Sequence, residues 1–393
     1  MAAVPKAAVC AGRQRFRLGR VLLNAVGTAG SDSPDRHGGN LAAAAQRLGC
    51  RPEQLLDASA SLVPFPPPLR LRRALARVAW RPYPDRGYRD LRAAIAALHG
   101  LDPDWVLPGN GAAELFTWAA RDAAALGPSH LSEPGFADYH RALACWDGAV
   151  RVRQLPLGSL AAGPQTWPPP PTATPVLWIT NPQNPTGQLW SRQSLEPLLD
   201  QHPLVIVDEA FLPLVPGGER QSLVPLLAAH PNLVVIRSLT KLFAIAGLRL
   251  GYALGQPQRL ARWSGWRDPW PVNALAAAAG EALLTDRSAY GRWCTRVQAW
   301  VAREGAWLQQ RLAALPGIKP LPSAANFLLL QAEHGGDASS LEPLRQRLEQ
   351  HHRILLRDCR SFAGLGPGWL RLGYQDRGGN RRIVAALARE LRQ

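Results

Sequence analysis

The apolar run from Asn232 to Ile236 leads into the stretch Arg237-Ser238-Leu239-Thr240-Lys241-Leu242-Phe243-Ala244-Ile245-Ala246-Gly247-Leu248-Arg249-Leu250-Gly251-Tyr252. The run is bounded by turn residues and predicts a buried strand. Only three of the 45 lysines and arginines in the chain are lysines, and Lys241 stands here close to two hydroxyl side chains. An amine can attack a carbonyl group, whereas a guanidinium stays protonated. Lys241 is therefore a candidate nucleophile, although a surface lysine in a loop would show the same local pattern.

Three apolar runs, at residues 176–179, 204–207 and 233–236, predict neighbouring strands. A polar residue follows soon after each run: Asn184, Asp208 and Lys241. The runs alternate with helical segments such as 191–200, a pattern typical of a mostly parallel sheet covered by helices on both faces. Ligands of such sheets bind beyond the carboxyl ends of the strands. The three polar residues are therefore expected to share one site.

Three motifs in a fixed order support this interpretation. They are Asn181-Pro182-Gln183-Asn184-Pro185-Thr186-Gly187, Val207-Asp208-Glu209-Ala210-Phe211, and the lysine stretch itself. In order and spacing they resemble the fold-type I pyridoxal-phosphate (PLP) enzymes of the aminotransferase superfamily, over about residues 36–390. The resemblance implies an α/β fold, in which a large domain has a mostly parallel, seven-stranded sheet between helices and a smaller domain is α+β.

Four further motifs resemble the threonine-phosphate decarboxylases of cobalamin synthesis, which are close relatives of the histidinol-phosphate aminotransferases. The motifs are His37-Gly38-Gly39-Asn40, Asp57-Ala58-Ser59-Ala60-Ser61, Pro134-Gly135-Phe136-Ala137-Asp138-Tyr139 and Arg357-Asp358-Cys359. This finer resemblance implies decarboxylation of L-threonine O-3-phosphate to (R)-1-aminopropan-2-yl phosphate and CO2, for the aminopropanol arm of cobalamin-type corrinoids. The alternative is a PLP-dependent aminotransferase acting on histidinol phosphate or a related amino acid. Sequence alone does not decide between them, because the outcome depends on which Cα bond stands perpendicular to the cofactor ring.

The resemblance implies a role for each residue around the cofactor ring. Lys241 would carry the cofactor and later move a proton, while Asp208 would pair with the pyridine nitrogen so that the ring accepts electrons from a carbanion. Asn184 would donate a hydrogen bond to the phenolate oxygen, for which many relatives also use a tyrosine where this chain has Phe211. Phe136 would stack on the ring, although a core position also explains a single phenylalanine.

A glycine turn, Pro108-Gly109-Asn110-Gly111-Ala112, opens a predicted helix and directs free N–H groups at an anion. The resemblance places five residues around the cofactor phosphate: Gly111, Ala112, Ser238, Thr240 and Arg249. Tyr83 matches a tyrosine that reaches across a dimer to the neighbouring cofactor's phosphate, but a packed loop aromatic would fit equally. The resemblance therefore implies a homodimer with shared sites.

Two arginines and a glycine-rich arm are the candidate substrate contacts. Arg371, in Leu370-Arg371-Leu372-Gly373, resembles the superfamily arginine that grips the substrate carboxylate. Arg357 resembles a second anion contact, suited to a phosphorylated substrate. The arm His37, Gly38 and Gly39 also matches a substrate-binding position that crosses to a partner subunit, although a simple turn explains two glycines as well. Asn184 completes this set.

Composition sets limits on function and location. A length of 393 residues suits two packed domains with a large core. The pattern along the chain and the family resemblance together imply four segments: an extension over 1–36, an arm and part of the small domain over 37–75, a PLP-binding domain over 76–284 and a small C-terminal domain over 285–393. The formal net charge of +16 would permit nucleic-acid binding, but the arginines are dispersed and form no recognisable module. We therefore expect no nucleic-acid partner.

The chain also carries no sign of a membrane or metal protein. No run approaches the ~18 apolar residues that span a bilayer. Four arginines precede a short apolar stretch at residues 21–23, but Asn24 and Gly27 interrupt it, so we expect no export signal. The five cysteines are scattered without metal-ligand spacing. They predict reduced thiols in a cytoplasmic protein with no bound metal.

Overall fold

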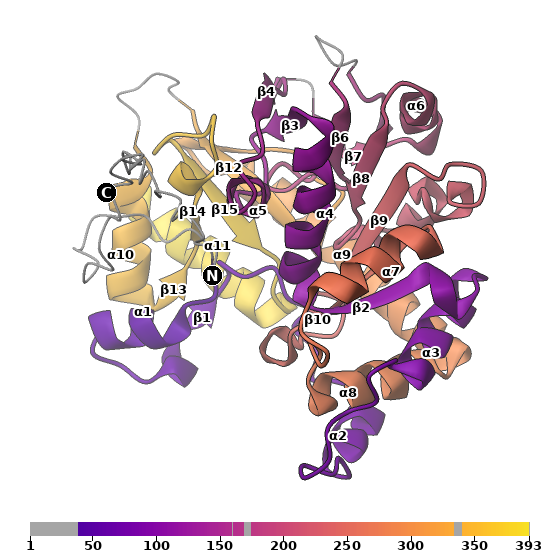
Figure 1. Ribbon diagram of the computed structural model, residues 1–393. Helices are drawn as coiled ribbons and strands as arrows, with labels where there is room; N and C mark the ends of the chain where they lie inside the picture. Colours follow the sequence, from indigo (N-terminus) through magenta and orange to yellow (C-terminus); the bar gives the residue numbers. More distant parts are fainter. Residues whose placement is uncertain (1–37, 159, 169–173, 334–339, 393) are drawn as a thin grey trace, which may run out of the picture. The chain divides into compact units, whose positions relative to one another are not determined.

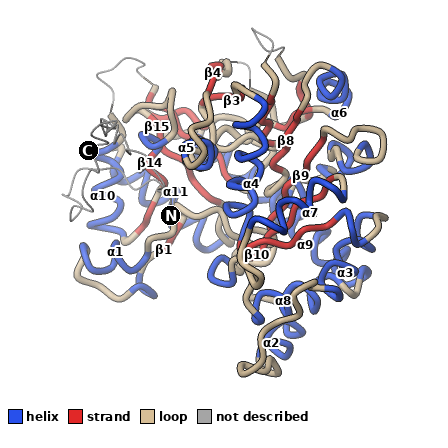
Figure 2. Tube along the Cα trace, viewed as in Figure 1, coloured by secondary structure: helices blue, strands red, loops and turns tan. Residues whose placement is uncertain are grey.

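A computed structural model describes residues 38–158, 160–168, 174–333 and 340–392, all within one compact unit, Asp35–Gln393. Figure 1 shows its helices and strands, and Figure 2 distinguishes them from the loops by colour. His37, the first residue of the predicted arm, lies outside the described residues. No helix in the described ranges combines the length and the hydrophobicity needed to cross a membrane.

The largest sheet has seven strands in the order β2-β10-β9-β8-β6-β3-β4. Their bounds are Val106–Asn110 (β2), Ser129–Glu133 (β3), Val150–Gln154 (β4), Val176–Thr180 (β6), Leu204–Asp208 (β8), Leu233–Ser238 (β9) and Leu250–Gly255 (β10). Every neighbouring pair from β4 to β9 is parallel, whereas β10 runs antiparallel to both β9 and β2. The prediction of a mostly parallel, seven-stranded sheet is thus confirmed.

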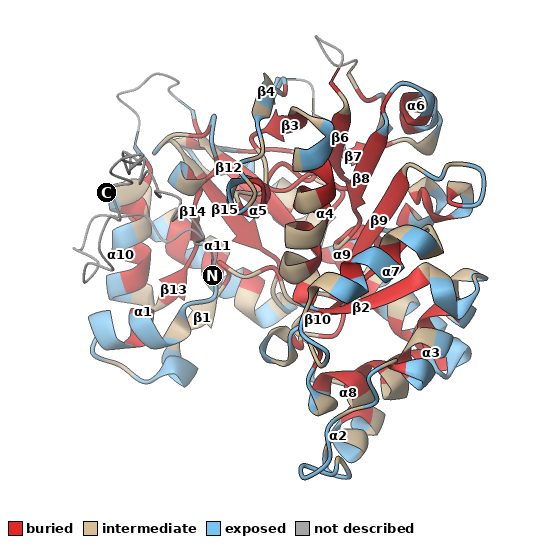
Figure 3. Ribbon diagram, viewed as in Figure 1, coloured by how far each residue is buried: buried red, intermediate tan, exposed pale blue. Residues whose placement is uncertain are grey.

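Alternate residues of the sheet enter two separate cores, one on each face. On β8, Val205 and Val207 belong to one core, and Leu204 and Ile206 belong to the other. Figure 3 shows the central strands buried along their length. Side chains of this kind contribute about 1.5–3 kcal/mol each when fully buried. This burial on both faces explains why the strands read as continuous apolar runs in the sequence.

Helices supply the other half of each core. The helices on one face include α4 (Gly111–Leu126), α5 (Asp138–Ala144) and α7 (Pro257–Trp266). Those on the other face include α3 (Arg89–His99), α8 (Ala274–Leu284) and α9 (Arg287–Leu312). The alanine-rich α8 has the predicted bounds. It begins after Asn273, whose side chain accepts a hydrogen bond from the backbone N–H of Ala276 at 2.8 Å.

A second, antiparallel sheet of four strands has the order β11-β12-β15-β14. Its strands are Ile318–Pro320 (β11), Phe327–Ala332 (β12), Arg357–Asp358 (β14) and Trp369–Gly373 (β15). It packs through leucines such as Leu328 and Leu370 into the same core as the helices α10 (Glu342–His352) and α11 (Arg377–Glu390). This sheet is the smaller one predicted for the C-terminal part, and the exact domain boundaries stay predictions.

Short elements complete the described fold. Two small sheets pair β1 (Leu56–Asp57) with β13 (Ile354–Leu355), and β5 (Pro164–Gln165) with β7 (Leu189–Trp190). The remaining α-helices are α1 (Leu41–Arg47), α2 (Leu69–Leu75) and α6 (Arg192–Leu195). The β1–β13 pair joins the chain next to the predicted arm to the C-terminal part of the sequence.

Two predicted elements differ from the structure. The sequence pattern predicts a last helix from Arg381 to Leu391, but α11 begins at Arg377, because the Asp376 side chain accepts a hydrogen bond from the N–H of Gly379 at 2.7 Å and caps it. The proline-rich sequence of residues 158–175 predicts a surface loop of polyproline II character. Trp167 within them is buried, and its backbone N–H donates to Ser194 Oγ at 2.9 Å. That segment is therefore partly built into the fold.

Candidate active site

Polar residues gather where the parallel strands of the large sheet end. Asp208 is the last residue of β8 and Ser238 is the last residue of the neighbouring strand β9. Asn184 and Lys241 follow in the loops after β6 and β9. Lys241 Nζ lies 5.8 Å from the centre of the Phe211 ring, which packs edge-to-face on Phe327. Cζ of Arg371 lies 4.9 Å from the centre of that Phe327 ring, and the same guanidinium donates to Asn184. The Asp208 carbonyl accepts the backbone N–H of Asn181 at 2.8 Å, which places β8 beside the loop that carries Asn184. The structure thus brings these strand ends together, and their shared role stays a prediction.

The Asp208 carboxylate is buried and held from two sides. The Tyr139 hydroxyl donates to Oδ2 at 2.6 Å, and the backbone N–H of Ala210 donates to Oδ1 at 2.9 Å. Burial raises the pKa of Asp208 to about 6, and these two hydrogen bonds partly offset that rise. A buried carboxylate with so few partners gains from a further N–H donor or cation. This is the contact that a protonated pyridine nitrogen would make.

The Lys241 amine lies in an environment that favours its neutral form. Burial, followed by the positive charges of Arg371 and Arg249, lowers the pKa of Lys241 to about 8. A larger fraction of this amine is therefore unprotonated near neutral pH than for an ordinary lysine. That property suits a lysine that attacks an aldehyde, as the sequence indicated.

The turn at the start of α4 forms a cup for an anion. Gly111 has φ +73°, and a Cβ atom at this position would lie 2.5 Å from Nη2 of Arg249. A Cβ atom on Gly251 would lie 2.7 Å from the backbone nitrogen of Ala112. Only glycine permits both approaches. The Arg249 guanidinium therefore lies against the N-terminus of a 16-residue helix, and the two positive groups together suit a phosphate.

Two hydroxyl groups lie at the rim of this cup. Ser238 pairs in register with Gly251, the glycine that touches Ala112, so its position adjoins the start of α4. Its Oγ accepts a hydrogen bond from the backbone N–H of Thr240 at 3.2 Å, and both side chains are buried. All five residues predicted for the phosphate site thus lie in one place, and their binding role stays a prediction.

The two predicted arginines face each other across the smaller sheet. Arg357 and Arg371 are direct partners in the antiparallel pair β14–β15, and both are buried. The Arg371 guanidinium donates to Asn184 Oδ1 at 2.5 Å and to the carbonyl of Ser59 at 3.1 Å. Its buried Nε–H has no hydrogen-bond partner among the described residues. Burial and the nearby Arg357 lower the pKa of Arg371 to about 10.

Two like charges in such a position indicate an anionic ligand. Burying a cation costs free energy unless an opposite charge or hydrogen bonds compensate it. The Phe362 ring lies 5.3 Å from Cζ of Arg357 and 5.7 Å from Cζ of Arg371, so one face of each guanidinium is covered. Arg357 donates to Ser361 Oγ at 2.5 Å, and a carboxylate or phosphate would supply an acceptor for the Arg371 Nε–H.

The glycine arm reaches this arginine pair through Ser59. The backbone N–H of Gly39 donates to Ser59 Oγ at 2.9 Å, and a Cβ on Gly38 would lie 2.4 Å from the Ser59 carbonyl oxygen. The same carbonyl accepts the hydrogen bond from Arg371. The Asp57 carboxylate fixes Ser59 by accepting from its hydroxyl at 2.6 Å. Gly38 and Gly39 therefore lie beside Ser59 and Arg371 of the same chain, and their substrate-binding role stays a prediction.

The two predicted aromatic residues have different surroundings. Phe136 is half-buried and packs edge-to-face against Tyr139, the partner of Asp208, with the ring centres 5.7 Å apart. That place is compatible with stacking on a cofactor ring. Tyr83 is 75% exposed and stacks on Trp270, with the ring centres 4.2 Å apart. Its ring is thus exposed and packs on another loop residue, and its predicted role at the site of a partner subunit stays a prediction.

Sequence reasoning missed three residues that support the site: Tyr139, Thr180 and Ser59. Tyr139 and Ser59 occur in the quoted motifs, but nothing in their spacing indicates that one contacts Asp208 and the other Arg371. Thr180 is the last residue of β6 and pairs in register with Asp208, and its hydroxyl lies 2.8 Å from that of Tyr139. In the sequence, the one feature that could have indicated Thr180 is its position as the polar residue that ends the apolar run of β6.

Comparison with known proteins gives a consistent result. Residues 64–387 match the family model described as aminotransferase class I and II. The threonine-phosphate decarboxylase of Salmonella typhimurium is 36% identical over 364 residues, which cover 89% of this chain and 95% of the relative. The histidinol-phosphate aminotransferase of Symbiobacterium thermophilum is 35% identical over 322 residues, which cover 80% of this chain and 84% of the relative.

Solved structures share the fold. The histidinol-phosphate aminotransferase from Clostridium acetobutylicum is 24% identical, with a TM-score of 0.75, and the match covers 86% of this chain and all of that one. The lysine, the buried aspartate and the phosphate cup fit the cofactor of such enzymes. The chain therefore belongs to the aminotransferase class I and II family, and it is a pyridoxal-phosphate-dependent enzyme.

Proposed function

We propose that this enzyme decarboxylates L-threonine O-3-phosphate to (R)-1-aminopropan-2-yl phosphate and CO2. The observation that carries the proposal is the pair of buried guanidiniums, Arg357 and Arg371, which are direct neighbours across β14 and β15. Threonine phosphate carries two anionic groups, a carboxylate and a phosphate, whereas histidinol phosphate carries only the phosphate. Two cations beside the glycine arm match the two anions of the first substrate. Because the keto-acid acceptor of an aminotransferase also carries carboxylates, the charge match supports decarboxylation together with the sequence of the relatives. The 36% identity to a threonine-phosphate decarboxylase supports the same choice.

The residues at the strand ends would divide the chemistry among them. Bound pyridoxal phosphate supplies an electron-withdrawing ring that accepts the electron pair left at Cα. Lys241 would hold the cofactor and, once released by the substrate amine, deliver a proton to Cα. Asp208, kept in place by the Tyr139 hydroxyl, would hold the proton on the pyridine nitrogen. Because Asn184 Oδ1 accepts from Arg371, its amide N–H group can face the phenolate oxygen.

Orientation at Cα decides which bond breaks. Only a bond perpendicular to the ring plane overlaps the π system, so a decarboxylase must hold the carboxylate out of that plane. We infer that the glycine arm and one arginine bind the phosphate and leave the carboxylate free to depart. Binding energy from the remote phosphate would then fix the geometry at the reacting carbon.

A direct test compares the two candidate substrates. Purified enzyme incubated with threonine phosphate should release CO2 and form aminopropanol phosphate without a matching amount of keto acid. Histidinol phosphate with a keto-acid acceptor should react far more slowly. Faster conversion of histidinol phosphate to the corresponding ketone would replace this proposal with the aminotransferase alternative.

We also propose a homodimer with shared active sites. Tyr83 is exposed and stacked on Trp270, so a partner subunit could receive its hydroxyl, as the family resemblance implies. Trp80, in the same segment, is 88% exposed, so two aromatic side chains of this segment are available to a partner. The partner's cofactor phosphate would accept the hydrogen bond from Tyr83.

Hybrid dimers test the sharing. Tyr83→Phe and Lys241→Ala proteins should each have low activity, and mixing them should restore part of it. The mixed dimer contains one site with Lys241 from one subunit and Tyr83 from the other. The control is each variant mixed with itself through the same exchange procedure. A monomer with full activity in sedimentation and kinetic measurements would rule the shared site out.

A further inference from the structure

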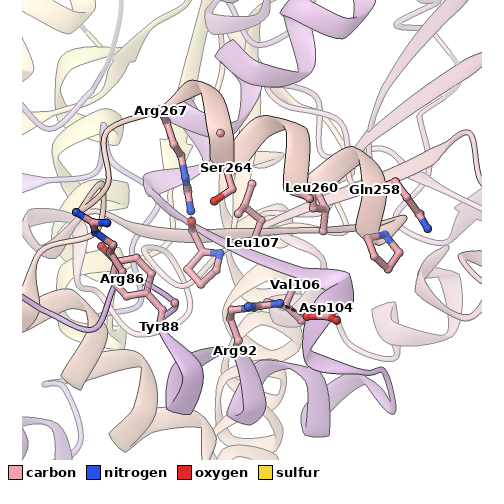
Figure 4. Close-up of a pocket in the computed structure, with 15 residues that line it drawn as sticks. Arg86, Tyr88, Arg92, Asp104, Val106, Leu107, Gln258, Leu260, Ser264 and Arg267 are labelled. Atoms are coloured by element: carbon pink, nitrogen blue, oxygen red, sulfur yellow. Dashed lines mark hydrogen bonds and ion pairs between the residues drawn. The ribbon is translucent and has the colours of Figure 1, made fainter.

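A cleft of about 540 Å³ lies between α3, α7 and β2, on a part of the chain that the proposed chemistry does not use. Figure 4 shows its lining, with Arg92 and Asp104 paired on one side and Arg267 entering from the end of α7. Nη2 of Arg92 lies 2.7 Å from Oδ1 of Asp104, so these two side chains form an ion pair with each other. Arg267 also lines the cleft, and its side chain is only 5% exposed.

Arg267 connects the cleft to the start of α4 through two contacts. Its Nη1 donates to the carbonyl oxygen of Pro108 at 2.6 Å, and it lies 3.5 Å from Oε1 of Glu114. Glu114 belongs to the first turn of α4, and its Oε2 accepts the backbone N–H of Asn110 at 2.6 Å. Asn110 immediately precedes Gly111. The contacts therefore run from Arg267 through Glu114 to the turn that forms the phosphate cup.

Glu114 has two opposite effects on that turn. Its carboxylate holds the N–H of Asn110 and so fixes the backbone that leads into Gly111. Its negative charge, however, lies within one helical turn of the place where a phosphate would bind, and like charges repel. A buried cation beside Glu114 offsets the repulsion and keeps the carboxylate in place. Arg267 is that cation, and the hydrogen bond to Pro108 also fixes the end of β2.

We propose that Arg267 is a positioning residue for the cofactor phosphate: it acts through Glu114 and Pro108 to hold the turn Asn110-Gly111-Ala112 in its anion-binding shape. The inference rests on the proposed placement of the phosphate in that turn. It concerns only cofactor binding and is independent of which amino acid the enzyme transforms.

The test compares two cofactor forms on apoenzyme, pyridoxal phosphate and pyridoxal, of which only the first carries the phosphate. Affinity is measured by absorbance or fluorescence titration. Arg267→Gln should weaken pyridoxal phosphate binding by about tenfold or more, the usual effect of losing a charge-assisted contact. Pyridoxal affinity should change by less than about twofold, because pyridoxal has no phosphate that could bind in this turn. Arg267→Lys keeps the charge but not the forked donor, and its loss should be smaller and again confined to pyridoxal phosphate.

Arg92→Gln is the matched control, because Arg92 lines the same cleft but pairs with Asp104 and donates to the Pro103 carbonyl, away from the turn. It should leave both affinities unchanged. Should Arg267→Gln fail to fold, Arg267→Lys carries the same comparison. Equal losses for both cofactor forms, or no loss for either, would overturn the proposal.

Arg249→Gln separates this inference from the placement of the cofactor. If that variant loses its preference for the phosphorylated form while Arg267→Gln keeps it, the phosphate site is correct and Arg267 is not part of its support. If Arg249→Gln also keeps the preference, the phosphate lies elsewhere and the role proposed for Arg267 is wrong with it.

Discussion

Replacing Lys241 by alanine is expected to lower kcat by at least about 10⁴-fold, since the covalent attachment and the proton transfer are lost together. In the wild-type protein, borohydride reduction followed by peptide mapping should place the pyridoxyl group on Lys241.

The pH dependence of cofactor attachment follows from the environment of Lys241, where burial and nearby cations lower the pKa of the amine to about 8. Only the neutral amine attacks an aldehyde. The rate at which apoenzyme binds the cofactor covalently should therefore rise with pH up to about 8 and level off above it.

Lys319 provides the control for this prediction. It lies exposed on β11, has no place in the candidate site, and is the other lysine in the described residues. A Lys319→Ala protein should keep wild-type activity and cofactor content. A pyridoxyl label on Lys319 or Lys6, or a Lys241→Ala protein with normal turnover, would contradict the assignment.

The parts of the site that the sequence predicted are those tied to strand ends. A strand buried on both faces shows as an apolar run, and the first polar residue after it marks the carboxyl end of the strand. Asp208 could be placed in this way because it is the last residue of its strand, whereas Ser238 was placed by the family resemblance and is also the last residue of its strand. The antiparallel strand β10 could not be identified so easily, because apolar runs indicate burial and carry no information on direction.

Contacts between distant parts of the chain could not be predicted. Arg371 donates to the carbonyl of Ser59, which is 312 residues away, and that acceptor is a backbone atom with no side-chain signature. Tyr139 contacts Asp208 only because α5 packs against the same face of the sheet. Such pairs depend on how helices pack on the sheet, and periodicity does not encode this packing. The motifs quoted from the resemblance included both residues without indicating what they touch.

The arginine pair shows the same limit at the candidate substrate site. Each arginine lies in a recognisable motif. That Arg357 and Arg371 are paired residues on neighbouring strands, however, follows from the register of the short antiparallel strands β14 and β15. Register determines that both guanidiniums share one side of the sheet, where each makes the other harder to bury without an anion. The proposed affinity of this pair for an anion therefore depends on the fold and could not be derived from either arginine alone.

Loss of either arginine is expected to lower kcat/KM for threonine phosphate by about 10²-fold or more. A charge-assisted contact contributes on the order of 1.5–3 kcal/mol, which corresponds to a factor of this size in kcat/KM. Arg371→Ala and Arg357→Ala are the test proteins, assayed for CO2 release. Arg360→Ala is the matched control, because Arg360 pairs with Asp358 and is one-third exposed, so its loss should change the rate by less than about threefold.

Comparing threonine phosphate with unphosphorylated threonine assigns a role to each arginine. Threonine should be a very poor substrate for the wild type, because it lacks the group whose binding orients Cα. The arginine that holds the phosphate should, when removed, lower the rate for threonine phosphate and leave the weak rate for threonine unchanged. The arginine that contacts the carboxylate should lower both rates. Near wild-type efficiency in both single variants would show that neither guanidinium binds the substrate, and the phosphate contact would then have to come from the glycine arm alone.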